Sequence, residues 1–422
     1  MRHYKPFFVA FFAIVIIGTP WIVTSYPWAT RFVDNIFGYI GNNFGAIFFV
    51  EGITIDELQD KYDSSERGRD KVRILIVPGH EPDYGGAEFG NLNERDMVVD
   101  VAQYMKEFFE NNEHYEVVIS RDRNMWNEDF EEYFAEHWDE IISFIQQNKA
   151  EMLRLVNNGA VTQVTDGVIH NTAPQNVAVR LYGINKWANE NDIDIAIHIH
   201  FNDYPRRDNT IPGEYSGLSI YVPEGQYSNS TSTRAVAQAV FNRLTKYNAI
   251  SDFPKENEGI VEEQELIAIG SFNTLDAPSM LIEYGYIYEP QFIDPDVRQS
   301  VFRDLAFQTY LGIEDFFGGE TSLAYDTLML PHKWQGDDTN NTNNTKNDTL
   351  SLQTALIIED LYPPVGRTKN DCPRTGKFGP CTKKSLGLFQ DKYGITGETD
   401  TVGVKTKNIL NYRYSQVPLS PQ

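Results

Sequence analysis

Cysteine is nearly absent from this chain of 422 residues, which contains only Cys372 and Cys381. Two thiols are too few for a structural zinc site built from four cysteine ligands. Because both cysteines lie close together near the C-terminus, they can form a local disulfide, and an exported protein would keep that bond. Two separate free thiols are the alternative, and the sequence leaves both open.

Positive charge is also in short supply, because 36 Lys and Arg residues are set against 60 Asp and Glu residues, giving a net charge of −24. Proteins that bind the nucleic-acid backbone need the opposite balance, so we expect no nucleic-acid partner. The acidity also disfavours adsorption to anionic lipid, but it carries no information about the fold. The length allows two or more domains, with at least one sizeable core.

The N-terminal segment lacks charge after Lys5, and its strongly apolar part runs from Phe7 to Thr24. These 18 residues are close to the minimum for a membrane-spanning helix. No clear Ala-x-Ala cleavage site follows, so we predict an uncleaved signal anchor in residues 1–30, with a cleaved signal peptide or a buried soluble helix as alternatives. Basic residues before the span place the main body outside the cytoplasm, either membrane-anchored or secreted. Residues 31–70 are then expected to form a juxtamembrane stalk.

Beyond this stalk, apolar strand-like runs alternate with amphipathic helical patterns. A pattern of period 3.6 follows the first run, with apolar residues at Met97, Val101 and Met105. The alternation indicates an α/β domain over residues 71–316, a twisted and largely parallel sheet flanked by helices. The expected strands are 72–77, 115–120, 193–199, 217–222 and 279–283, and further helices are expected near 177–190, 231–246 and 297–316.

Chemically active side chains stand where the predicted strands end. His80 follows the first strand, His200 follows the third and Glu283 ends the last. Ligands of open α/β sheets bind beyond these carboxyl ends, and a fourth group, Glu94, opens the first helix. Two His and one carboxylate form a known set of catalytic zinc ligands, and a second carboxylate can act as general base. Each residue alone has an ordinary structural explanation, but the set of four favours a metal site.

Four segments of the chain carry distinctive motifs: VPGHEPDYGGAEFGNLNERD (77–96), VVISRD (117–122), AIHIHFN (196–202) and PSMLIEYGYI (278–287). In this order they resemble the zinc-dependent N-acetylmuramoyl-L-alanine amidases of the Amidase_3 class. The resemblance covers roughly residues 71–316. It implies that His80, Glu94 and His200 hold zinc and that Glu283 is the catalytic carboxylate.

His198 replaces a serine of the family pattern, and Asn202 fixes the register that assigns the ligand role to His200. Alternate residues of a strand share a face, so His198 lies on the same face as His200. From this shared face we expect His198 to contact the zinc ligands as a supporting group or to relay a proton, and we expect Asn202 to be a second supporting group. Val77 stands where the family has an acidic residue, and the loop after His80 also departs from the pattern, which leaves the substrate groove and its regulation open.

A long insert at about residues 124–175 interrupts the alternation and predicts one or two extra helices. Some cell-division members of the family are held inactive by a helix that blocks the site. A carboxylate of the insert could block the open zinc position in the same way. The alternative is a surface subdomain that packs on the sheet or widens the substrate groove. The insert contains Glu128, Asp129, Glu131, Glu132, Glu136, Asp139 and Glu140, with His137 among them.

A second domain is expected after residues 317–349, whose polar, low-complexity part predicts a flexible linker between two nearly independent domains. Residues 350–413 offer three short helices. The segment GKFGPCTKKSLGLFQDKYGI (376–395) resembles the peptidoglycan-binding type 1 domain, a three-helix module, and a diverged second copy follows at 396–411.

Together these resemblances imply a zinc hydrolase that cleaves the amide bond between N-acetylmuramic acid and L-alanine in peptidoglycan, for cell-wall remodelling or daughter-cell separation. Zn²⁺ is the expected cofactor. Peptidoglycan, the membrane and a regulatory cell-division protein are the expected partners. A zinc peptidase that acts on another wall bond and a non-enzymatic wall-binding scaffold are the alternatives.

Overall fold

The structure is a computed structural model that describes residues 52–65, 70–165, 167–168, 173–203, 207–319, 325–335 and 345–416. The predicted signal anchor and the first part of the predicted stalk lie outside these residues. Within the described ranges, no helix is both long enough and apolar enough to cross a membrane.

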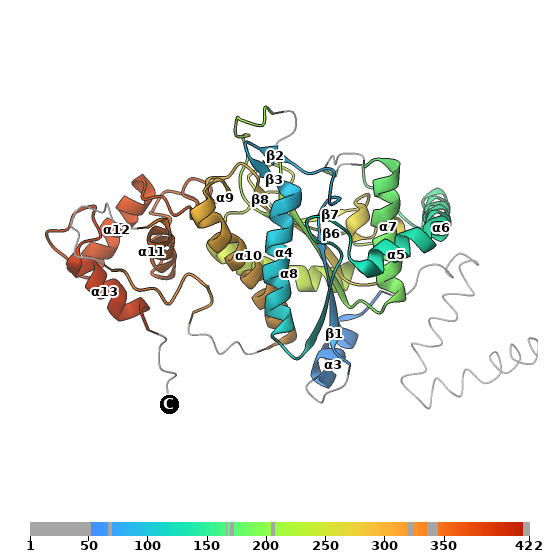
Figure 1. Cartoon of the computed structure of the whole chain (residues 1–422), viewed down its shortest axis with the longest axis horizontal. Coiled ribbons are helices and arrows are strands. Elements are labelled where there is room, and N and C mark those ends of the chain that lie inside the picture. Colours follow the sequence, from blue (N-terminus) through green and yellow to red (C-terminus); the bar gives the residue numbers. More distant parts are fainter. Residues whose placement is uncertain are drawn as a thin grey trace, which may run out of the picture. The chain divides into compact units, whose positions relative to one another are not determined.

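A six-stranded sheet forms the centre of the larger domain, with the strand order β4-β1-β5-β8-β6-β7. Figure 1 shows this sheet between helices on either side. All neighbouring strands run parallel except β6, which is antiparallel to β8. The predicted largely parallel sheet is therefore confirmed. The strands are β1 (Val72–Pro78), β4 (Tyr115–Ile119), β5 (Ile195–Asn202), β6 (Ser219–Pro223), β7 (Ile260–Glu263) and β8 (Ser279–Tyr286), and β2 (Glu88–Phe89) and β3 (Leu92–Asn93) form a separate two-stranded ribbon.

Helices cover both faces of the sheet because successive strand residues point to opposite sides. Ile74 and Ile197 pack against α4, α8 and α10 on one face, whereas Leu75 and Ala196 pack against α5 and α7 on the other. The helices of the first face are α4 (Glu94–Glu110), α8 (Ser230–Tyr247) and α10 (Pro295–Phe317). The second face carries α5 (Glu128–Glu136), α6 (Trp138–Asn157) and α7 (Gln175–Glu190), and short helices lie at α9 (Pro290–Ile293), η2 (Ile267–Ile269) and η3 (Ser271–Asn273).

The stalk prediction is wrong for residues 52–65, because helix α3 (Ile55–Ser65) belongs to the sheet domain. Leu58 is fully buried in the main core, and the ring of Tyr62 stacks on the ring of Phe317 with centroids 4.4 Å apart. Lys61 forms an ion pair of 2.6 Å with Asp194, which precedes β5. The stalk prediction rested on the charged residues of this segment, but its apolar residues share one face of an amphipathic helix.

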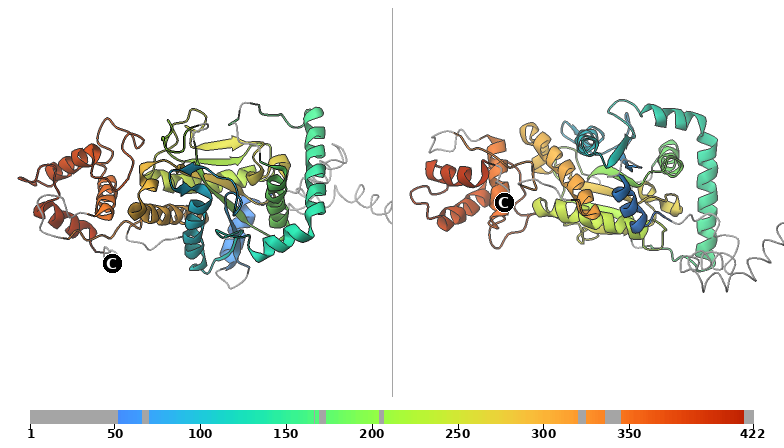
Figure 2. Two further views of the ribbon diagram at one scale, coloured as in Figure 1. Left: turned by 45° about the horizontal axis from the view of Figure 1, so that its top comes forward. Right: turned by 90° about the horizontal axis from the view of Figure 1, so that it is seen from below.

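Two helices, α5 and α6, occupy the insert, and α6 runs along the outer side of α7 (Figure 2). Phe130 and Ile141 are fully buried in the same core cluster as Trp187 of α7 and Leu75 of β1. The insert is therefore part of the packed second face rather than an appendage.

The C-terminal unit contains the three predicted helices, α11 (Lys346–Ile358), α12 (Pro380–Lys392) and α13 (Val404–Tyr414). Its repeat is visible in equivalent hydrogen bonds. Gln353 of α11 donates to the hydroxyl of Thr382 in the first turn of α12, and Gln390 of α12 donates to the hydroxyl of Thr406 in the first turn of α13. Cys372 and Cys381 form a disulfide that ties the loop before α12 to the start of that helix.

The predicted linker is wrong for residues 325–335 and 345–349. Leu330 and Trp334 are buried in the core of the C-terminal unit, and α11 begins at Lys346 after a capping box formed by Thr345 and Asp348. Residues 336–344, which hold most of the low-complexity stretch, lie outside the described residues. The linker prediction rested on the polar residues of this stretch and did not take into account the apolar residues at both of its ends.

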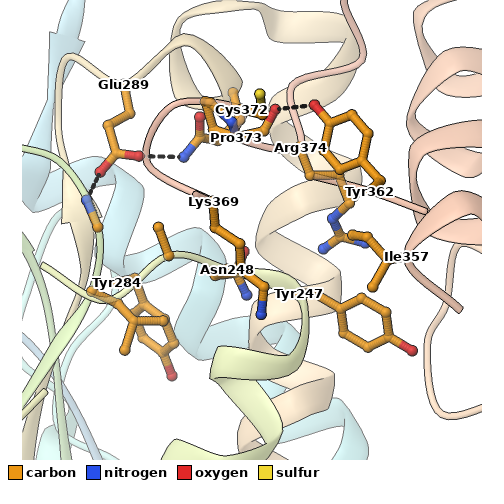
Figure 3. Close-up of a pocket in the computed structure, with 14 residues that line it drawn as sticks. Tyr247, Asn248, Tyr284, Glu289, Ile357, Tyr362, Lys369, Cys372, Pro373 and Arg374 are labelled. Carbon is orange, nitrogen blue, oxygen red and sulfur yellow. Dashed lines mark hydrogen bonds between the residues drawn. The ribbon is translucent and has the colours of Figure 1, made fainter. Parts of the chain in front are cut away.

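The C-terminal unit packs closely against the sheet domain (Figure 3). Arg374, with a side chain only 2% exposed, forms an ion pair with the fully buried Asp304 of α10. Lys369 donates to the carbonyl oxygens of Thr245 and Lys246 at the end of α8. The cavity that remains between these side chains measures about 20 Å³, room for roughly one water molecule. The expectation of two nearly independent domains is therefore wrong.

Candidate active site

The four site residues predicted from the sequence come from three adjacent strands and one helix. His80 follows β1, His200 lies in β5, Glu283 lies in β8 and Glu94 is the first residue of α4. His200 and Glu283 are direct neighbours in the register of the parallel pair β5–β8. The ligand atoms of His80, Glu94 and His200 all lie within 4.8 Å of one another, so three of the four residues form one compact donor cluster.

Gly79 allows the two histidines to approach each other. A Cβ atom at this position would lie 2.3 Å from Cε1 of His200, which is too close for two carbon atoms that are not bonded to each other. His80 itself has a left-handed backbone with φ of 68°. This conformation turns the chain sharply at the end of β1. The Pro-Gly-His sequence therefore sets the position of the His80 ring against the His200 ring, with centroids 4.9 Å apart.

Glu94 joins both histidines. Its Oε1 lies 2.8 Å from Nε2 of His80 and 3.1 Å from Nδ1 of His200. The same carboxylate accepts hydrogen bonds from the backbone N–H groups of Ala87 at 2.8 Å and Phe201 at 3.0 Å. Burial would raise the pKa of Glu94, but the two histidines outweigh it and hold the pKa well below its usual range. The group is therefore an anion aimed between two imidazoles.

The donor set fits a divalent transition metal. Two imidazole nitrogens and one carboxylate oxygen are a set that catalytic zinc sites use, and such sites keep a further position open. Nε2 of His80 is buried and, beyond its close approach to Glu94, has no hydrogen-bond partner among the described residues, so it is available as a ligand. Burial lowers the pKa of His200, which favours the neutral imidazole that metal binding requires.

Glu283 faces this cluster from the neighbouring strand. Its Oε2 is buried and has no hydrogen-bond partner within the described part of the chain. Burial, followed by the nearby carboxylates of Glu94 and Glu256, raises the pKa of Glu283 well above its usual range. A carboxylate with a free oxygen and a raised pKa is suited to accept and return a proton.

His198 lies on the same face as His200, two residues earlier in β5, and is not part of the donor cluster. Its side chain is almost completely buried, and this burial, together with the neighbouring His200, lowers its pKa to about 3. His198 is therefore neutral across the physiological range. Asn202 does not contact the donor cluster through its amide group, because its Nδ2 donates to Oε1 of Glu256 at 2.8 Å.

Arg121, the fifth residue of the VVISRD motif, was not assigned a role from the sequence. Its fully buried guanidinium donates to the carbonyl oxygens of Pro78 and Gly79 before His80 and to that of Arg95 after Glu94. One side chain thus ties together the two segments that carry His80 and Glu94. Burial lowers its pKa to about 10, so it remains a cation at neutral pH.

Glu256 is a second residue that the sequence did not reveal. It lies in a polar loop before β7, where a glutamate is normally exposed, yet its side chain is buried. Its carboxylate accepts hydrogen bonds from Asn202, Tyr221, Ser251 and Tyr286. No local pattern in KENEGI distinguishes it from the solvated charges around it.

The seven acidic residues of the insert named above are all exposed. Glu140 forms contacts with His137 and Lys186 on the helix surface, and no acidic residue of the described part of the insert joins the donor cluster. The interpretation of the insert as a carboxylate plug is therefore not supported by the described residues. Its packing on α7 agrees with the subdomain alternative.

Similarity to known proteins is found at the level of a family and of solved structures. A sequence model of the family Amidase_3, described as N-acetylmuramoyl-L-alanine amidase, matches residues 74–314. The N-acetylmuramoyl-L-alanine amidase from Clostridium difficile 630 is 17% identical, over 60% of this chain and 100% of that chain, with a TM-score of 0.37. For AmiC2 of Nostoc punctiforme the identity is 18%, the shares are 60% and 99%, and the TM-score is 0.37. The CwlD amidase from Clostridioides difficile, solved in complex with the GerS lipoprotein, is 15% identical over 59% of this chain and 99% of that chain, with a TM-score of 0.38. A comparison with curated proteins gives no match.

The family match spans more than half of the chain, and it contains His80, Glu94, His200 and Glu283 together with the sheet that positions them. This protein therefore belongs to the Amidase_3 family of N-acetylmuramoyl-L-alanine amidases and is a hydrolase.

Proposed function

We propose that this amidase is zinc-dependent and hydrolyses the bond between the lactyl group of N-acetylmuramic acid and the L-alanine of the stem peptide. The observation that carries the proposal is the convergence of His80, Glu94 and His200 within 4.8 Å, with Glu283 on the adjacent strand. Three donors of this kind leave room for substrate, and a fourth group is left to handle the proton.

The side chains of the site divide the work between holding the ion and moving a proton. Zinc, when bound, supplies a Lewis acid that polarises the amide carbonyl. Glu283 takes a proton from the attacking water and returns it to the leaving amine, because its free oxygen and raised pKa suit both directions. Arg121 and Gly79 hold the two ligand segments in place, so that the site is formed before substrate arrives.

The rest of the chain supports an extracytoplasmic role. We propose that the N-terminal segment exports the protein and anchors it, and that the C-terminal helices bind peptidoglycan. The resemblance of residues 376–395 to a wall-binding module supports the second point. A regulatory partner from cell division remains part of the proposal.

The proposal is tested by digestion of purified peptidoglycan with the zinc-loaded protein and mass spectrometry of the products. We expect stem peptides with a free N-terminal L-alanine and glycan strands that keep their lactyl groups. Peptides cut internally would instead identify a zinc peptidase, and no release of fragments would identify a wall-binding scaffold.

A Glu283→Gln variant is the matched control for the digestion. It keeps the shape and removes the base, so we expect zinc binding to persist while turnover falls by about 10²–10⁴-fold. A variant with near-normal turnover would refute the proposed role of Glu283.

A further inference from the structure

Glu256 is a buried carboxylate beside the proposed site that the proposed chemistry does not use. Its Oε1 accepts from the Tyr221 hydroxyl at 2.6 Å and from Nδ2 of Asn202 at 2.8 Å. Its Oε2 accepts from the Ser251 hydroxyl and, at 3.3 Å, from the Tyr286 hydroxyl. These four hydrogen bonds compensate the cost of burying the carboxylate, because a buried charge without hydrogen-bond partners would be strongly destabilising.

The four donors come from separate elements that meet at the catalytic edge of the sheet. Asn202 stands two residues after His200 at the end of β5, and Tyr286 ends β8, three residues after Glu283. Tyr221 belongs to β6, which pairs with β8, and Ser251 lies in the loop between α8 and β7. Glu256 therefore connects the ends of the two strands that carry a proposed ligand and the proposed base.

The donors around Glu256 contrast with the surroundings of Glu283. Oε2 of Glu283 has no hydrogen-bond partner among the described residues, although this oxygen atom is itself buried. The hydroxyl of Ser219, the cross-strand neighbour of Glu283 on β6, has none within those residues either. Hydrogen bonds to a carboxylate favour its charged form and make it a weaker base. The nearby phenols and amide are thus directed to Glu256, and Glu283 keeps a free oxygen.

We propose that Glu256 is a positioning residue that acts through Asn202, Tyr221 and Tyr286: it fixes the ends of β5 and β8 and keeps these donors away from the Glu283 carboxylate. The inference rests on the proposed function, in which Glu283 handles the proton. Glu256 itself does not touch the donor cluster of His80, Glu94 and His200.

The test is the Glu256→Gln variant of the full chain, assayed on a soluble muropeptide substrate. Glutamine has nearly the same shape, and its oxygen can still accept hydrogen bonds. Its amide nitrogen is a donor, however, and it would face groups that donate to the carboxylate in the wild type. We expect kcat to fall by about 10- to 100-fold, with KM within about twofold of the wild type and the zinc content unchanged at about one ion per chain.

Glu314→Gln is the matched control. Glu314 is also a buried carboxylate that accepts a hydrogen bond from a tyrosine, Tyr115, but that tyrosine begins β4 at the opposite end of the sheet. Both variants are expected to lower the unfolding temperature, and Glu314→Gln is expected to keep its kcat. An equal loss of kcat in the two variants would overturn the inference, because it would reflect general damage.

Four further results would contradict the proposal. A kcat of Glu256→Gln within about twofold of the wild type, or a loss of its zinc, would overturn the positioning role. Should that variant not fold, Tyr221→Phe removes one donor and keeps the ring; it is expected to lower kcat to a smaller extent, and an unchanged kcat would overturn the role. A Glu283→Gln variant that keeps its turnover would overturn the proposed function itself, and the inference with it.

Discussion

At position 79 the chain has no room for a side chain, and this sets the geometry of the proposed metal site. The Cβ of an alanine would lie within 2.3–2.7 Å of three atoms of the His200 ring. We expect Gly79→Ala to displace that ring, to abolish zinc binding and activity, and to destabilise the protein by about 1–3 kcal/mol. Zinc analysis and thermal unfolding measure both effects.

The control for this substitution is Gly387→Ala. Gly387 lies within α12, and apart from its chain neighbours and its own helix backbone no atom of the described residues lies within 4 Å of the point that its Cβ would occupy. We expect this variant to retain zinc and activity, since alanine favours a helix. Retention of zinc by Gly79→Ala would show that the His200 ring is not confined as the structure has it.

The two histidines of β5 have different expected roles although both lie on one face. We expect His200→Ala to lose zinc and activity, because two remaining ligands cannot hold the ion in the needed geometry. His198→Ser, which introduces the residue of the family pattern, is expected to retain most of the zinc, although removal of a buried ring lowers its stability. Metal analysis of the two purified variants decides the point, and the reverse ranking would show that the register of the site was assigned wrongly.

At the scale of elements, the insert helices belong to the core. Phe130 of α5 is fully buried against Trp187 of α7, with ring centroids 4.5 Å apart. We expect Phe130→Ala to destabilise the protein by about 3–5 kcal/mol, the usual cost of a large cavity. Met125, at the start of the same insert and 61% exposed, provides the control. Its replacement by alanine should change stability by less than about 0.5 kcal/mol.

Chemical denaturation of both variants distinguishes the two views of the insert. A Phe130→Ala variant as stable as the wild type would mean that α5 only decorates the sheet. Removal of α5 would expose the apolar faces of α7 and β1 that it covers.

At the scale of the whole molecule, the two domains are joined by a buried ion pair. Arg374→Met would leave Asp304 of α10 buried without its charged partner. We expect a loss of about 3–5 kcal/mol in the free energy of unfolding. Arg367→Met is the control, since the Arg367–Asp371 pair is exposed and should contribute no more than about 1 kcal/mol.

The same experiment reports on domain coupling. Because Asp304 also accepts hydrogen bonds from Thr327 and Leu328, the ion pair holds both the connecting segment and the loop before α12. We expect the wild type to unfold in one transition. Two separate transitions in the wild type, or an unchanged stability of Arg374→Met, would contradict a rigid junction. Removal of residues 336–422 should accordingly lower the stability of the sheet domain as well as weaken any binding to the cell wall.

The main sheet, the three C-terminal helices and the candidate donor set could be predicted from the amino-acid sequence. These features depend on local patterns, namely alternating apolar residues and polar side chains at strand ends. Parallel strands place their carboxyl ends at the same end of the sheet. The position of His80, His200 and Glu283 at such strand ends was therefore enough to group them. β7 was missed because its four residues, IVEE, are too short and too acidic to give a strand pattern.

The residues that support this end of the sheet could not be predicted from the sequence, because they are distant along the chain and meet only in the folded protein. Arg121 belongs to a segment of the family resemblance but received no role there, and Glu256 looks like an ordinary surface charge in the sequence. The roles of both follow from burial among groups that are distant along the chain. The attachment of α3 and the Asp304–Arg374 junction arise in the same way. A side chain's partners depend on how separate elements pack together, and no pattern within one element contains that information.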